Sequence, residues 1–192
     1  MFSTSTRRAL LAAATLALCA LWATPARAQF SNHSIGFEAG GVYIPSPGIS
    51  SGGALGLDST LYMESGVELY FRILVGIHHV NGLSLCQTDT EPNRNACNVV
   101  GLMPAFGFRY LFIEDNIRPY LGLNVAYEAY FTTNYISRFS ISPMAGIEFF
   151  VSDNFSIGLQ VEYHMLLALN STPDYDWLEH GVVGLVKVGW YF

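Results

Sequence analysis

His164 and Glu162 are two residues apart, so in a β-strand their side chains would lie on the same face. With Ser140, which is expected on that face too, they supply a base, an orienting acid and a nucleophile. An enzyme that modifies membrane lipids would need its serine and histidine on a lipid-facing surface, and no His-x-Ser pair lies on such a surface. The sequence therefore predicts that His164 fills the interior, that no residue is catalytic and that the chain is not an enzyme.

Histidines and cysteines are also the candidate metal ligands. His78, His164 and His180 are expected near one end of the fold, but their spacing does not define a ligand set. Cys86 and Cys97 are separated by ten residues and lack the Cys-x-x-Cys spacing of a zinc site. We therefore expect no metal site and no cofactor, and in an oxidising compartment we expect the two cysteines to form a disulfide in a loop.

The N-terminal segment indicates export to such a compartment. Arg7-Arg8 precedes an apolar run, and Ala26-Arg27-Ala28 has the small-x-small pattern of a signal-peptide cleavage site. A twin-arginine signal or a lipoprotein signal fits less well, and Leu18 is bulky where lipidation needs a small residue. Residues 1–28 are therefore predicted to be a cleaved signal peptide, and residues 29–192 to form one domain.

The composition separates this domain from soluble proteins and from nucleic-acid-binding proteins. Of 192 residues, 51% are hydrophobic, 14% are aromatic and only 12% are charged, against roughly 25% charged in an average soluble domain. After residue 28 there are six basic and fifteen acidic residues, a net charge of −9, and Lys187 is the single lysine of the chain. Such a charge would repel a phosphate backbone, so no nucleic-acid partner is expected.

Alternating apolar and polar residues predict eight β-strands separated by turns. Three connections are tight turns, at residues 64–66, 114–116 and 152–154, and the other four are longer. The predicted strands are Ser34–Ile44, Ala54–Met63, Val67–Val80, Asn98–Phe112, Arg118–Phe131, Ser137–Phe150, Phe155–Leu169 and His180–Phe192.

All charged residues of these strands lie on one face, and the other face is apolar. The strands of a soluble barrel or sandwich also alternate apolar and polar residues, but their solvent-exposed outer face would carry many charged residues, lysine especially. With a single lysine, the charged face must be the small inner one, which predicts an all-β transmembrane antiparallel up-and-down barrel of eight strands. The charged residues predicted to face the lumen are Glu38, Asp58, Glu68, Arg72, Arg109, Arg118, Glu128, Arg138, Glu148, Glu162 and Lys187.

From residue 29 onward the chain resembles the small eight-stranded outer-membrane barrels of Gram-negative bacteria, the group that includes the transmembrane domain of outer-membrane protein A. The most specific resemblance is Trp190-Tyr191-Phe192, where Trp190 and Phe192 resemble the terminal signal read by the barrel assembly machinery. The resemblance implies a location in the outer membrane, contact with its lipid and lipopolysaccharide, and insertion by that machinery.

Strand parity and the turns predict which lumen charges face each other. We expect these charges to form a rigid polar plug; the alternative is a gate, in which Lys187 exchanges between Glu162 and Glu38. The expected neighbours are Asp58 with Arg72, Glu68 with Arg109, Glu128 with Arg138 on a diagonal, Arg118 with Glu148 on a diagonal, and Lys187 with both Glu162 and Glu38.

The external loops are expected to be acidic. Their excess of acids predicts a solvated, self-repelling surface, with weak divalent-cation binding beside lipopolysaccharide as the alternative. The function predicted from the sequence is structural or surface-interactive, and the alternatives are a narrow channel or carrier for small solutes and, less favoured, a lipid-modifying enzyme. The loop residues concerned are Asp89, Glu91, Asp174, Asp176 and Glu179, against Arg94.

Overall fold

The computed structural model describes most of the region predicted to form strands. The described residues are 33–44, 48–63, 66–81, 86, 96–112, 116–131, 136–168 and 178–192. The predicted signal peptide at residues 1–28 lies outside them, as do the loop residues Asp89, Glu91, Arg94, Asp174 and Asp176.

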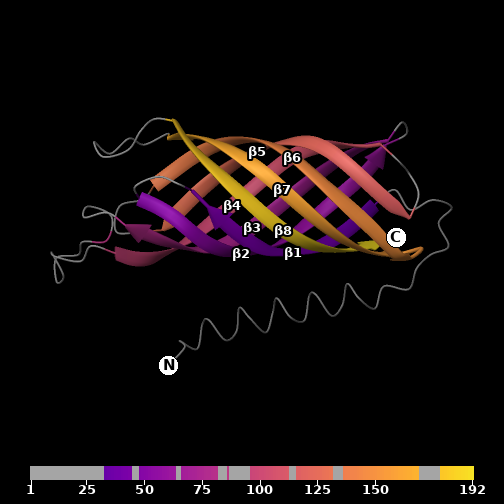
Figure 1. The fold of residues 1–192 in the computed structure, drawn as a ribbon, viewed down its shortest axis with the longest axis horizontal. Coiled ribbons are helices and arrows are strands. Elements are labelled where there is room, and N and C mark those ends of the chain that lie inside the picture. The colour runs from indigo at the N-terminus through magenta and orange to yellow at the C-terminus, as the bar shows by residue number, and fades with distance from the viewer. Residues whose placement is uncertain are drawn as a thin grey trace, which may run out of the picture. The chain divides into compact units, whose positions relative to one another are not determined.

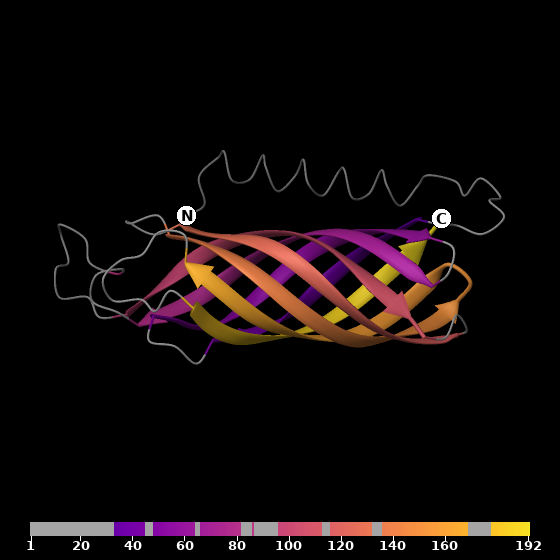
Figure 2. The same ribbon diagram turned by 90° about the horizontal axis from the view of Figure 1, so that it is seen from above.

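Eight antiparallel strands form a closed barrel in which each strand pairs with its neighbours in sequence and β1 pairs with β8. Figure 1 shows the strands running obliquely around the barrel, and Figure 2 shows the same closure from above. The predicted all-β, eight-stranded up-and-down barrel is confirmed. The strands are β1 (His33–Tyr43), β2 (Gly48–Met63), β3 (Val67–Asn81), β4 (Ala96–Leu111), β5 (Ile117–Phe131), β6 (Ile136–Ser152), β7 (Phe155–Ala168) and β8 (Leu178–Tyr191).

Most strand ends lie within two residues of the predicted positions, and β2 is the exception. It begins at Gly48 rather than Ala54, so much of the segment predicted as a loop pairs with β1 and β3. This part of β2 contains Gly52 and Gly53, which have no side chains, and therefore shows no alternation in the sequence although its backbone is paired. Strand β8 also begins earlier than predicted and includes Glu179.

The short connections β2–β3, β4–β5 and β6–β7 meet at one end of the barrel, together with the start of β1 and the end of β8. Gly66, in the first of these turns, has a φ of 79°, a conformation that other residues rarely adopt. In the third, Asn154 accepts a hydrogen bond from the Tyr191 N–H and donates one through Nδ2 to the Tyr191 carbonyl, each at 2.8 Å. The β6–β7 turn therefore holds the end of β8 in place.

The two faces of the barrel wall are inverted relative to a soluble protein. On β3, Phe71, Ile73 and Val75 point outward and are 41–50% exposed, whereas Arg72 and Leu74 point inward and are buried. Ten of the eleven predicted lumen charges are buried, and Arg118, near the turn end, is half-buried. Among the described residues, no helix is long and apolar enough to cross a membrane.

The lumen is not polar throughout. In the half of the barrel nearer the longer connections, inward apolar side chains pack into one cluster that includes Leu74, Met103 and Leu166. Cys86 and Cys97 lie at this cluster, and they form the predicted disulfide, with their Cα atoms 5.5 Å apart. The sequence parity did not distinguish this apolar part of the lumen from the charged part.

Replacing both cysteines by serine is expected to lower the free energy of unfolding by at most about 3 kcal/mol, because the disulfide closes a short loop. Urea unfolding of the barrel with and without reductant measures this difference. Reductant should destabilise the unmodified chain and leave the double variant unchanged. Two thiols that react in the folded chain without prior reduction would contradict the disulfide.

Candidate functional site in the barrel lumen

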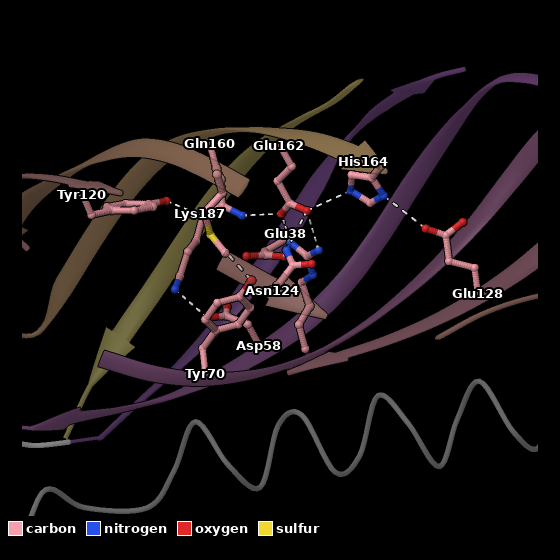
Figure 3. Close-up of polar contacts among 12 residues, drawn as sticks. Glu38, Asp58, Tyr70, Tyr120, Asn124, Glu128, Gln160, Glu162, His164 and Lys187 are labelled. Carbon is pink, nitrogen blue, oxygen red and sulfur yellow. Dashed lines mark hydrogen bonds and ion pairs between the residues drawn. The ribbon is translucent and has the colours of Figure 1, made fainter. Parts of the chain in front are cut away.

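Part of the inner face of β6 carries small residues, which lets side chains of β5 and β7 meet above it. Ser140 and Ser142 point inward, and a Cβ added at Gly146 would overlap the Tyr120 ring. Tyr120 on β5 donates a 2.6 Å hydrogen bond to Gln160 Oε1 on β7 (Figure 3). Where β6 carries glycine or serine, polar side chains of β5 and β7 therefore contact each other across it.

Glu162 on β7 is the centre of the polar network. Its carboxylate accepts two hydrogen bonds from the Arg72 guanidinium, one through each terminal nitrogen. It also accepts bonds from Asn124 Nδ2 at 2.9 Å and Gln160 Nε2 at 2.5 Å, and His164 Nε2 lies 2.9 Å away (Figure 3). A bidentate pair with three further polar contacts satisfies a carboxylate that has no exposed surface.

Arg72 contacts two carboxylates, because Glu38 on β1 approaches to 3.6 Å the same guanidinium nitrogen that pairs with Glu162. Lys187 on β8 donates a 2.5 Å bond to Asp58 on β2, across the inner face of β1 (Figure 3). A Cβ at Gly36 on β1 would overlap the Asp58 carboxylate, so this ion pair requires glycine there.

One of the pairings predicted at this level, Lys187 with Glu162, is wrong, and two others lie opposite each other but have different ion-pair partners. Asp58 and Arg72 are opposite each other in the β2–β3 register as expected, but their ion-pair partners are Lys187 and Glu162. Glu162 is opposite Val183, not Lys187, since the β7–β8 register places Lys187 four residues away. Glu38 is opposite Lys187 as predicted, yet its ion-pair contact is Arg72.

A second cluster lies toward the turn end. Glu68 and Arg109 are opposite each other and form the predicted ion pair. Arg109 also lies 4.0 Å from Glu148, which accepts hydrogen bonds from Ser156 at 2.5 Å and Tyr191 at 2.9 Å. Arg118 is directly opposite Glu148 rather than diagonal to it, and its guanidinium lies 4.0 Å from the centre of the Phe150 ring.

A third cluster lies toward the longer connections. Arg138 and Glu128 are directly opposite in the β5–β6 register, not diagonal. Arg138 pairs with Glu179 at 2.6 Å, and Glu179 is buried in β8 instead of lying in an external loop as predicted. Tyr130 donates a 2.6 Å hydrogen bond to Glu128. Glu179 is therefore an additional lumen acid. It was not predicted as one because it lies at the edge of a segment predicted to be a loop.

The histidines do not converge on a metal site. His78 and His164 point into the lumen, whereas His180 lies on the outer wall and its Nδ1 is 2.9 Å from the Tyr163 hydroxyl. Both ring nitrogens of His78 are buried without a hydrogen bond, and the ring meets Tyr130 edge-on at 5.2 Å. Within the described parts of the chain, no group of three or more His, Cys, Asp or Glu side chains is arranged to hold a metal ion.

The Ser140–His164–Glu162 combination does not have the geometry of an activated nucleophile. Both ring nitrogens of His164 contact carboxylates, Nε2 with Glu162 and Nδ1 with Glu128 at 3.1 Å. The Ser140 hydroxyl has no hydrogen-bond partner. A serine needs a free histidine nitrogen to accept its proton, and here neither nitrogen is free.

The uncharged polar residues of the network were not predicted as site residues. Tyr120, Asn124, Tyr130 and Gln160 have the same strand parity as the charged residues, and that parity is the signal that could have identified them.

Solved structures with this architecture are small outer-membrane barrels. The Neisserial surface protein A structure matches with a TM-score of 0.61 and 12% identity, over 84% of this chain and 98% of that one. The outer membrane protein OprG of Pseudomonas aeruginosa matches with a TM-score of 0.56 and 14% identity, over 84% and 97%. The N-terminal β-barrel domain of OprF from the same organism matches with a TM-score of 0.54 and 16% identity, over 85% and 100%.

No family model matches the chain, and no curated protein matches it. At such low identities the structural matches establish the fold alone. The chain has the fold of the small eight-stranded outer-membrane β-barrels.

Double-mutant cycles should reproduce the pairing seen in the lumen. Lys187→Met combined with Asp58→Asn is expected to show a coupling free energy of about 2–3 kcal/mol, and Lys187→Met combined with Glu162→Gln below about 0.5 kcal/mol, because only the first pair is in contact. Urea unfolding in detergent micelles measures the three single and two double variants. Stronger coupling of Lys187 to Glu162 than to Asp58 would contradict the observed pairing.

Proposed function

We propose that this chain is an integral protein of the bacterial outer membrane, with a packed, ion-paired lumen and a structural or surface-interaction role. The observation that carries the proposal is the inversion of the barrel wall: the charged groups of the strands are inside, and large apolar side chains cover the outside. In water, exposure of this apolar outer surface would be unfavourable, whereas the hydrocarbon region of a bilayer would solvate it.

The lengths of the strands support the same proposal. The shortest strand, β1, has 11 residues, which corresponds to about 36 Å of extended chain. With the tilt of about 40° that is usual in such barrels, it spans about 28 Å along the barrel axis, enough for an apolar band of about 25 Å. Each of the eight strands is therefore long enough to cross the bilayer.

Aromatic side chains at both ends of the outer wall suit the two membrane interfaces. Trp190 packs against Phe155 near the turn end, and Tyr43 and the Tyr163–His180 pair are exposed near the other end. Amphipathic aromatic rings collect where headgroups meet acyl chains. The proposed partners are outer-membrane lipid, including lipopolysaccharide.

Export and assembly form part of the proposal. Residues 1–28 would direct export and be removed, leaving Gln29 as the first residue of the barrel domain. Trp190 and Phe192 are both exposed at the C-terminal end of β8, where the barrel assembly machinery can contact them.

The proposed role includes no catalysis, no cofactor and no steady conductance at neutral pH. Both nitrogens of His164 are occupied, and Glu162 is fully buried among four polar partners that include Arg72 and Gln160. A barrel of eight strands is just wide enough for such side chains to fill it.

Leu57→Arg is expected to lower the free energy of unfolding in a lipid bilayer by about 2–4 kcal/mol, because Leu57 points outward opposite Phe37, next to the middle of β1. Val151→Arg, on the outer face at the end of β6, is the matched control and should cost at most about 1 kcal/mol. Heat-dependent gel mobility after urea titration measures the folded fraction. Equal, small costs at both positions would contradict membrane insertion.

A further inference from the structure

His164 has an ionisable partner on each ring nitrogen. Nε2 lies 2.9 Å from Glu162 and Nδ1 lies 3.1 Å from Glu128, and the His164 side chain is only 6% exposed. A neutral imidazole has one N–H donor and one acceptor lone pair, whereas an ionised carboxylate only accepts. If the imidazole were neutral and both carboxylates were ionised, one contact would place the lone pair of a ring nitrogen against a carboxylate oxygen. The geometry therefore requires one further proton among the three groups.

The charged and titratable groups around His164 come from every strand that contributes to this part of the lumen. On β3, Arg72 binds both oxygens of the Glu162 carboxylate, and His78 lies against Tyr130. On β5, Tyr130 donates to Glu128. The remaining charged groups of this region are Glu38 on β1, Asp58 on β2, Arg138 on β6, and Glu179 and Lys187 on β8.

His164 connects two clusters of the lumen network. Glu162 belongs to the central cluster with Arg72 and Gln160, whereas Glu128 belongs to the cluster at the longer connections with Tyr130. Figure 3 shows the imidazole between the two carboxylates, with dashed contacts on both sides. Ser140 and Ser142 of β6 are small, and the bridge passes over the inner face of β6 from His164 on β7 to Glu128 on β5.

We propose that Glu128, His164 and Glu162 form a proton-binding site, and that its one bound proton joins the central cluster to the cluster at the longer connections and keeps the lumen closed. When the proton leaves, one N–H or O–H bond of the triad breaks, its electron pair stays on the nitrogen or oxygen and a water molecule takes up the proton, so that a lone pair and a carboxylate face each other at about 3 Å. The side chains then separate, and water and small ions enter the lumen.

Nitrogen-15 NMR of labelled histidine together with carbon-13 NMR of labelled glutamate carboxyls, in detergent micelles, tests the site without any membrane assay. At about pH 7.5, above the ordinary imidazole pKa of about 6.5, the triad should retain its proton, seen as two N–H groups on His164 or as one protonated carboxyl of Glu128 or Glu162. The outer-wall His180 should be neutral under the same conditions, and a His164→Gln variant assigns the signals. A neutral His164 between two ionised carboxylates would overturn the proposal.

Planar-bilayer conductance tests the closing role, which rests on the proposed membrane insertion. His164→Gln cannot carry the positive charge, and it is expected to raise open probability at neutral pH about tenfold or more. The double variant His164→Gln, Glu128→Gln lacks one of the two carboxylates that face residue 164. It should return the barrel to the closed state. His180→Gln, on the outer wall, is the matched control and should remain closed.

A folded, inserted and silent His164→Gln barrel would overturn the closing role. If His164→Gln does not fold, the NMR measurement on the unmodified chain still decides whether the proton is bound. Failure of the unmodified chain to insert into bilayers would instead contradict the proposed function. The NMR measurement in micelles would still decide whether the triad binds its proton.

Discussion

A charge inside a closed eight-stranded barrel has almost no access to water, and the rest of this structure depends on that constraint. Each buried acid or base must find a partner within the lumen, since an uncompensated charge in such a place is strongly destabilising. The Arg72–Glu162 pair meets this requirement most completely, with two hydrogen bonds between the side chains and further donors on the carboxylate. The other lumen groups are arranged around this pair.

Space is the second constraint, and small residues provide it. Tyr120, Lys187 and Asp58 reach partners on strands that are not their neighbours because glycine lies beneath them, at Gly146 in one case and Gly36 in the other. A larger residue at either glycine would push a polar group away from its partner. The alternation of long and short inner side chains is therefore an electrostatic requirement as well as a packing requirement.

The lumen has distinct parts with different physical roles. Toward the turns, the Glu68–Arg109 pair and the hydrogen bonds to Glu148 fill the interior with polar contacts. Toward the longer connections, the apolar cluster around Leu74 and Leu166 excludes water. His164 lies between the central charges and Glu128, so its contacts link regions that otherwise pack separately.

The sequence by itself determined the barrel, its strand number and the inward direction of the charged side chains. These features follow from a period of two and from composition, both of which are local and can be counted along the chain. It also determined the Glu68–Arg109 pair and the Cys86–Cys97 disulfide, because both connect neighbouring strands or a single loop. The paired glycines of β2 were missed, because a strand without side chains has no alternation.

Only the tertiary structure decided which charges meet across the lumen. Long side chains such as those of Arg72 and Lys187 reach past the adjacent strand, so their partners depend on barrel stagger and on where neighbouring side chains are short. The burial of Glu179 and the position of His164 between two carboxylates depend on the same geometry. Parity along one strand defines the direction of a side chain, but its partner depends on all eight strands together.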